Sequence, residues 1–203
     1  MFINTTKGQV DFALNLTSDH LDNLTLAHEF RNDSLYKSIF TKKESLQRVL
    51  GNGGKVALAL LDMKTVVGFA SVDFPRPENR WGSIGGKTVM ELNSVEVTPE
   101  FRKYRIAQSL MSQLMADPEL EQKVLYLVSY QWIWDLDQTN LSPHAYRNLL
   151  IKLFSGFEFK EFVTNEPNVC LNKNNIFMVR YGKNVTTALR EAFKWSSFGL
   201  SFD

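Results

Sequence analysis

The distribution of apolar positions divides the chain into strand-like and helix-like segments. Short apolar or alternating runs predict strands, and apolar residues spaced three or four apart predict helices. The predicted strands cover residues 10–16, 56–61, 66–74, 88–97, 124–130, 157–163 and 176–181. A helix with apolar positions Leu21, Leu24 and Leu26 is predicted after Ser18-Asp19, and further helices are predicted over residues 46–50, 106–115, 142–154 and 186–195. This mixture of elements indicates an α+β protein.

Breaks in the pattern separate these elements without separating domains. Gly51-Asn52-Gly53-Gly54 ends one helical stretch, and Pro75-Arg76-Pro77 ends a strand and opens a loop. The sequence contains no internal repeat, low-complexity tract or linker. We therefore predict one continuous domain over residues 1–203.

Composition and charge restrict the classes of function. The 203 residues include 23 basic and 22 acidic side chains, which gives no global electrostatic reason to expect nucleic acid or an anionic membrane as a partner. A single cysteine excludes an intramolecular disulfide, and three scattered histidines argue against a metal site. The first residues lack a signal-peptide pattern, and no window holds the roughly 20 apolar residues of a membrane helix. We expect a cytoplasmic protein.

One segment combines a strand end, a basic turn and a helix start. The predicted strand ends at Val97, a turn begins at Pro99, and a helix begins near Arg105 without an acidic first turn. Unpaired N–H groups at such a helix start favour anions, and Arg102 and Lys103 add positive charge nearby. The segment is therefore either a seat for a pyrophosphate or a solvated basic loop between core elements.

The same segment is similar to the acetyl-CoA-binding signature of the GNAT superfamily, Val-x-Pro-x-x-Arg-x-x-Gly-x-Gly/Ala. The resemblance implies the GNAT acetyltransferase fold, with a mixed central sheet and helices on both faces, and acetyl-CoA as the acetyl donor. The cofactor-binding residues that it implies are Val95, Val97, Arg102, Lys103, Tyr104, Arg105, Ile106, Ala107 and Gln108. Arg105 stands where the signature has a glycine. We expect its side chain to point to solvent or to add to phosphate binding.

Further motifs resemble the acetoin-utilisation acetyltransferase (AcuA) family within this superfamily. They lie in one order from about Ala57 to the end of the chain: Glu78-x-Arg80-Trp81, Glu91-Leu92, Val95-Glu96-Val97, Tyr130-x-Trp132-x-Trp134-Asp135-Leu136, Tyr146-Arg147, Thr164-x-Glu166-Pro167 and Gly182-Lys183-Asn184-Val185. The resemblance implies a protein-lysine acetyltransferase that modifies and inactivates acetyl-CoA synthetase. It does not indicate an oligomeric state.

Two glutamates on the predicted cofactor strand are candidates for the general base. An amine must lose a proton before it attacks a thioester, and a lysine with a pKa near 10.4 is mostly protonated at neutral pH. Glu91 lies six residues before Val97, which is similar to the general-base position of lysine-acetylating GNAT enzymes. Glu96 is the second candidate, and strand alternation sends the two to opposite faces. Either could instead pair with a nearby basic residue.

Aromatic residues supply the remaining candidates. Many GNAT enzymes protonate the leaving thiolate with a tyrosine, but Lys152 occupies that position here, so Tyr130 or Tyr146 would substitute. Each could equally be an aromatic residue at the edge of the core. Trp132 and Trp134 either line a substrate channel for a lysine stem or cap the core.

Two other functions fit the sequence. Arg105 and the missing tyrosine also suit a non-catalytic acetyl-CoA-binding regulator. Acetylation of a small amine is a further possibility, although the chain shows no acidic cluster to bind one.

Overall fold

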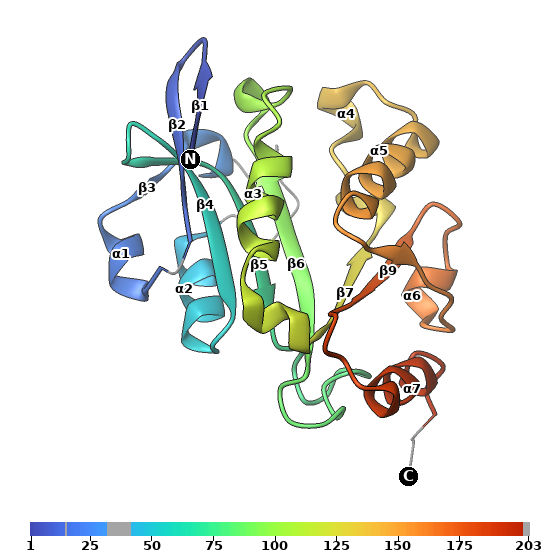
Figure 1. Ribbon diagram of the computed structural model, residues 1–203. Helices are drawn as coiled ribbons and strands as arrows, with labels where there is room; N and C mark the ends of the chain where they lie inside the picture. Colours follow the sequence, from blue (N-terminus) through green and yellow to red (C-terminus); the bar gives the residue numbers. More distant parts are fainter. Residues whose placement is uncertain (15, 32–41, 201–203) are drawn as a thin grey trace. The chain divides into compact units, whose positions relative to one another are not determined.

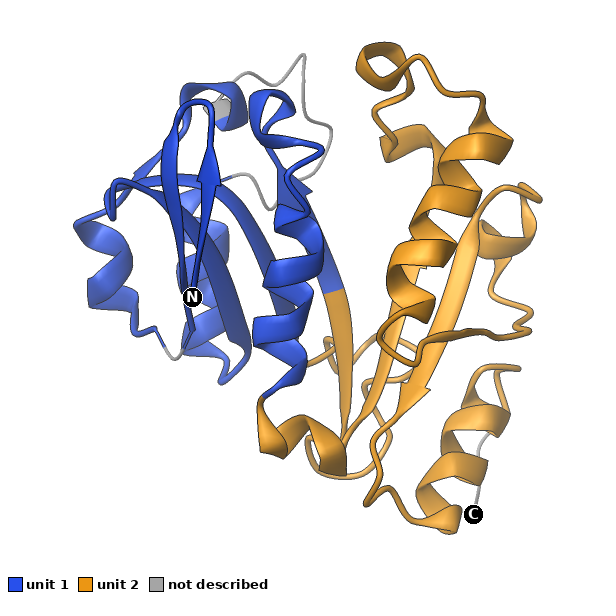
Figure 2. Cartoon of the chain, turned by 45° about the horizontal axis from the view of Figure 1, so that its top comes forward, with its two compact units in different colours: residues 1–73, 93–116 blue, residues 74–92, 117–203 orange. Residues whose placement is uncertain are grey.

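A computed structural model describes residues 1–14, 16–31 and 42–200. The chain divides into two compact units, and each consists of two separate stretches of sequence (Figure 2). Unit 1 contains residues 1–73 and 93–116, and unit 2 contains residues 74–92 and 117–203. Strand β6, Val89–Val97, begins in unit 2 and ends in unit 1.

Unit 1 contains a sheet in the order β1-β2-β4-β5, followed by the end of β6 (Figure 1). Its other strands are β1 (Phe2–Thr5), β2 (Gly8–Ala13), β3 (Thr25–Leu26), β4 (Lys55–Leu61) and β5 (Thr65–Asp73). Its helices are α1 (Ser18–Asp22), η1 (His28–Arg31), α2 (Lys43–Gly51), η3 (Pro99–Phe101) and α3 (Ile106–Met115). Strand β3 pairs with β5 in parallel, whereas the β1–β2, β2–β4 and β4–β5 pairs are antiparallel.

The core of unit 1 lies on both faces of this sheet, because β5 is almost entirely buried. Gly68 faces α3, where an added Cβ would lie 3.0 Å from the carbonyl oxygen of Glu96 and 3.3 Å from Ile106. The next residue, Phe69, points to the opposite face and contacts the ring of Phe30 at a centroid distance of 5.2 Å. Helix α3 and η1 therefore cover opposite faces of the strand.

Unit 2 continues from the first part of β6 in the strand order β6-β7-β9-β8. Its other strands are β7 (Val124–Ser129), β8 (Lys160–Glu161) and β9 (Ile176–Tyr181). Its helices are η4 (Pro118–Gln122), η5 (Gln131–Ile133), α4 (Leu136–Thr139), α5 (Pro143–Ser155), α6 (Pro167–Cys170) and α7 (Thr187–Ser196). Strands β6 and β7 are parallel, and β9 is antiparallel to both β7 and β8. Parallel and antiparallel pairs together make a mixed sheet.

Four buried rings form what we call the aromatic cluster: Trp81, Tyr126, Phe177 and Phe193. Their centroids lie 4.5–6.4 Å apart, and Phe193 comes from α7. The Trp81 indole also donates a hydrogen bond of 3.2 Å to the hydroxyl of Ser197, just after α7. Loop, sheet and C-terminal helix are thus joined in one core.

Most predicted elements are confirmed, and the helix at 106–115 and the strand at 176–181 have the predicted bounds. Of the strand predicted at 157–163, only Lys160 and Glu161 form a strand, β8, and the rest of the prediction is wrong. Phe157 and Phe159 donate N–H groups to the carbonyl oxygen of Phe154, and Glu158 has φ of 66°, so these residues close α5 as a turn. The helix predicted after Ser18-Asp19 ends at Asp22, because Thr25 and Leu26 pair with β5 as strand β3. Strand β1 and the short helices α4 and α6 were not predicted.

Across the described ranges, no helix is long and apolar enough to span a bilayer. The same residues contain no group of three or more His, Cys, Asp or Glu side chains that could hold a metal ion.

Candidate functional site

The turn after β6 is fixed at both of its ends. The Thr98 N–H donates to the carbonyl oxygen of Val67 on β5 at 3.0 Å. The Arg102 Nε donates to the carbonyl oxygen of Val97, the last residue of β6, at 3.2 Å. Arg102 therefore closes the turn with its side chain, and Val95 and Val97 lie half-buried just before it.

Arg105 adopts the left-handed backbone conformation that glycine favours, with φ of 60° and ψ of 22°. This conformation explains physically why the signature has a glycine at the position. The Arg105 side chain is exposed and makes no cap hydrogen bond, which agrees with the predicted direction toward solvent. Lys103 is also left-handed, with φ of 72°. The turn thus keeps a glycine-like path without glycine.

The residues at the start of α3 fit an anionic phosphate group. The first N–H groups of a helix, here from Ile106, Ala107 and Gln108, have no acceptor within the helix. No acidic residue lies in the first turn of α3. The N-cap residue, Arg105, makes no side-chain hydrogen bond to the N–H groups of this turn. Lys103 and Arg105 are exposed and positively charged. Together with the positive end of the helix dipole, they favour a negatively charged ligand.

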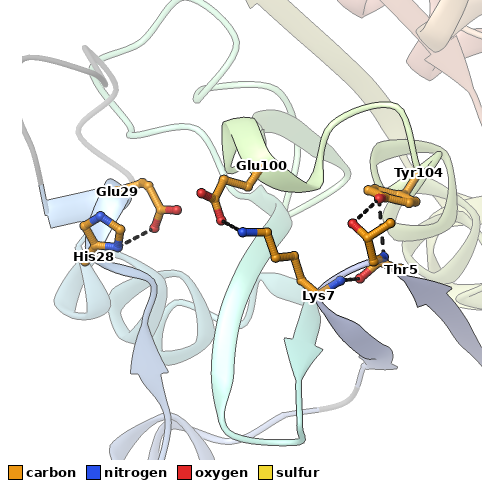
Figure 3. Close-up of polar contacts among 7 residues, drawn as sticks. Thr5, Lys7, His28, Glu29, Glu100 and Tyr104 are labelled. Atoms are coloured by element: carbon orange, nitrogen blue, oxygen red, sulfur yellow. Dashed lines mark hydrogen bonds and ion pairs between the residues drawn. The ribbon is translucent and has the colours of Figure 1, made fainter.

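The hairpin of β1 and β2 contacts this turn through two polar pairs (Figure 3). The Tyr104 hydroxyl accepts a hydrogen bond from the N–H of Thr6 at 3.3 Å and shares one with its hydroxyl at 2.7 Å. These hydrogen bonds lower the pKa of Tyr104. Lys7 forms an exposed ion pair of 3.2 Å with Glu100. The sequence did not reveal these contacts, because β1 was not predicted.

In unit 2, the carboxylate of Glu91 accepts a hydrogen bond from the hydroxyl of Tyr126 at 3.0 Å. The two residues are direct partners across the parallel strands, in the last pair of the β6–β7 ladder. Tyr126 is 1% exposed within the aromatic cluster. Burial, followed by the charge of Glu91, raises the pKa of Tyr126 well above its usual value of 10. The phenol therefore stays protonated and remains a hydrogen-bond donor.

Sequence reasoning missed Tyr126. A tyrosine inside a predicted buried strand was the available signal, but its partner depends on the strand register.

Tyr130 follows β7 and stacks on Trp132, with ring centroids 4.3 Å apart. Burial raises the pKa of Tyr130 to about 12, with smaller contributions from the carboxylates of Glu166 and Glu91. Trp132 is 51% exposed, so this stack presents an aromatic surface to solvent.

Trp134 occupies a different environment from Trp132. It is 4% exposed, donates to the Ser129 hydroxyl at 2.7 Å and stacks on Tyr146 at 5.2 Å. Its burial fits the core-capping alternative, and the stack on Trp134 also holds the ring of Tyr146.

An asparagine-rich loop holds Gln131, the residue between Tyr130 and Trp132. The side-chain carbonyl of Gln131 accepts hydrogen bonds from Asn172 at 3.0 Å and Asn174 at 2.7 Å. The Gln131 N–H donates to the side chain of buried Asn175 at 2.8 Å. These contacts fix the backbone from which Tyr130 and Trp132 project.

The predicted site residues thus form two groups. The cofactor-binding candidates lie together in unit 1, and Glu91, Tyr130, Trp132 and Trp134 belong to unit 2. Glu96, the alternative base, belongs to unit 1, and β6 joins the two groups through the backbone.

Comparison with known proteins shows what the whole chain resembles. No family model matches the chain. The chain is 28% identical over 168 residues to the acetoin utilization proteins AcuA of Bacillus licheniformis and Bacillus subtilis, which covers 82% of this chain and 80% of each relative. An acetoin utilization protein from Exiguobacterium sibiricum has a TM-score of 0.88 at 24% identity, covering 98% of this chain and 93% of that structure.

A more distant solved structure extends the likeness in fold. The GNAT phosphinothricin acetyltransferase of Sinorhizobium meliloti, in complex with acetyl-CoA, has a TM-score of 0.54 at 17% identity. The match covers 86% of this chain and 90% of that one. The chain therefore has the fold of the GNAT acetyltransferases, and its sequence is similar to those of the AcuA proteins.

Proposed function

We propose that the chain is a cytoplasmic protein-lysine N-acetyltransferase that uses acetyl-CoA and that acetylates and inactivates acetyl-CoA synthetase. The similarity to AcuA and the GNAT fold support this reading. The observation that carries it is the Glu91 carboxylate, which is hydrogen-bonded to Tyr126 and lies on the strand that continues into the phosphate-fitting turn.

The turn would hold the donor by its phosphates. The main-chain N–H groups of residues 106–108 lie at the start of α3, where a helix binds anions, and Lys103 and Arg105 supply positive charge. Acetyl-CoA supplies the activated acetyl group. Because the contacts are with backbone, replacement of the individual basic side chains should weaken binding modestly.

Glu91 acts as the general base. A lysine amine is mostly protonated at neutral pH, so its proton must leave before the nitrogen attacks the thioester carbonyl. An ionised carboxylate takes that proton directly or through a water. The new N–C bond forms as the C–S bond breaks, the sulfur leaves with the electron pair, and the nitrogen releases its second proton to solvent to give the amide.

Tyr130 stabilises the leaving sulfur. With a pKa of about 12 it stays protonated throughout the neutral range. Its pKa lies far above the roughly 8.5 of an ordinary thiol, so complete proton transfer to a thiolate is uphill. The residue therefore acts as a hydrogen-bond donor, and the thiolate takes its proton from solvent.

The Tyr130–Trp132 stack fits the aliphatic stem and ammonium group of a lysine. Exposed aromatic faces attract cations and cover apolar chains. This feature favours a protein side chain over a small polyamine, whose several positive charges call for acidic residues.

The deciding experiment combines purified acetyl-CoA synthetase, acetyl-CoA and this protein, followed by intact-mass measurement of the synthetase. We expect a mass gain of one acetyl group and loss of synthetase activity. Glu91→Gln is the matched control, because it keeps the side-chain shape and removes the base. Acetylation of a small amine without modification of the synthetase would overturn the substrate assignment. Cofactor binding with no transfer to any amine would favour a non-catalytic regulator.

A further inference from the structure

The hydrogen bond between Tyr126 and Glu91 joins the aromatic cluster of unit 2 to the carboxylate that the proposed chemistry needs. The hydroxyl of Tyr126 lies 3.0 Å from Oε2 of Glu91. The two side chains share a face because their residues are direct partners in the parallel ladder. A phenol held at this register therefore fixes the direction of the carboxylate.

The ring of Tyr126 cannot rotate freely. It contacts Trp81 at a centroid distance of 4.5 Å, Phe193 at 6.0 Å and Phe177 at 6.2 Å. Trp81 is in turn fixed by its hydrogen bond to Ser197. The hydroxyl is thus delivered to Glu91 by a packed core, which is how a supporting residue holds a reacting group in place.

The aromatic cluster and the Tyr126 hydroxyl act in opposite directions on the charged form of Glu91. An aromatic environment disfavours a charged carboxylate, whereas a hydrogen bond to the charged form favours it. The phenol itself does not ionise, because burial and the nearby carboxylate raise its pKa. Its donated hydrogen bond favours the charged form of Glu91 beside a largely apolar cluster.

We propose that Tyr126 is a positioning residue for the general base, an inference that rests on the proposed function. Tyr126 orients the Glu91 carboxylate and favours its deprotonated form, and does not itself exchange a proton with the substrate. The contact couples the C-terminal helix, through Phe193 and Trp81, to the acid–base chemistry.

Other ionisable groups near this contact must be separated from the effect. They include Tyr130 after β7, Glu166 at the start of α6, Tyr181 on β9, and Arg190 of α7, whose guanidinium lies 4.8 Å from the Tyr181 ring. Tyr181 packs against the same cluster, in an edge contact with Phe193. Tyr181→Phe is therefore the matched control, since it also removes one phenol at the cluster.

The test measures acetyl transfer against pH for the parent, Tyr126→Phe and Tyr181→Phe. The base must be ionised, so kcat/KM falls as pH drops through its apparent pKa. Loss of the hydrogen bond removes stabilisation of the charged form, so the acid limb of Tyr126→Phe should move upward by about one pH unit. The rate at pH 7 should fall at least tenfold, acetyl-CoA affinity should stay unchanged, and Tyr181→Phe should keep the parental limb.

A second readout needs no turnover. Carboxyl ¹³C NMR of glutamate-labelled protein follows the titration of Glu91, identified by its loss in Glu91→Gln, in the parent and in Tyr126→Phe. We expect a higher midpoint in the variant. An unchanged midpoint and an unchanged acid limb in an active, folded variant would overturn the positioning role and leave the proposed function standing. A parent without acetyl transfer would instead refute the proposed function, while the NMR titration would still decide whether Tyr126 controls Glu91.

Discussion

Replacing Arg105 with glycine should stabilise the protein, because the backbone at this position is already left-handed. A non-glycine residue in this conformation costs roughly 1–2 kcal/mol. Glycine removes that cost but adds about 0.5–1 kcal/mol of unfolded-state entropy. The exposed side chain has no cap hydrogen bond to lose. The free energy of unfolding should therefore rise by about 0.5–1 kcal/mol, or the melting temperature by roughly 2 °C.

Three matched variants isolate the cause. Lys103→Gly, also at positive φ, should change stability in the same direction. Gln108→Gly replaces an exposed residue inside α3 and should destabilise the fold by about 1 kcal/mol. Arg105→Ala removes the charge and keeps most of the backbone strain, so its difference from Arg105→Gly measures the strain less the unfolded-state entropy that glycine adds.

The assays are thermal unfolding and calorimetric titration with acetyl-CoA. Affinity should change by less than about tenfold, or roughly 1.4 kcal/mol, because the proposed phosphate contacts are with backbone. Equal destabilisation by Arg105→Gly and Gln108→Gly would refute the backbone argument. A hundredfold gain in affinity would mean that Arg105 obstructs the turn, and would favour a regulator over an enzyme.

Three further outcomes test the proposed site. Glu91→Gln should retain acetyl-CoA affinity and lose about 10²- to 10⁴-fold in rate, with partial recovery toward pH 10 as the amine loses its own proton. A rate within threefold of the parent at pH 7, with chemistry limiting, would contradict the role of Glu91 as the base. Ala107→Pro should abolish calorimetric binding by removing an N–H donor, whereas Arg102→Ala should weaken it modestly; full affinity in the proline variant rejects the turn. Trp132→Ala should raise KM for the protein substrate with little change in melting temperature. Trp134→Ala should instead lower the free energy of unfolding by about 3–5 kcal/mol. Equal melting-temperature shifts in the two variants would contradict this division.

The sequence by itself determined the longer helices and strands and the turn after β6. Helix 106–115 could be predicted because its amphipathic spacing is local and its start follows a recognisable turn. The turn could be predicted because proline, arginine and a following helix occur within ten residues. The same local information placed Glu91 on the strand that leads into it.

Tertiary structure decided which side chains meet. The contact between Glu91 and Tyr126 depends on the register of strands separated by 35 positions, and a shift of one residue would send one side chain to the opposite face. The hydrogen bond between Thr6 and Tyr104 joins residues 98 positions apart through a hairpin too short to predict. Local sequence preferences act over a few residues, whereas strand pairing is selected by the packing of the whole core. For this reason the turn was visible in the sequence, but the contact between Tyr126 and Glu91 was not.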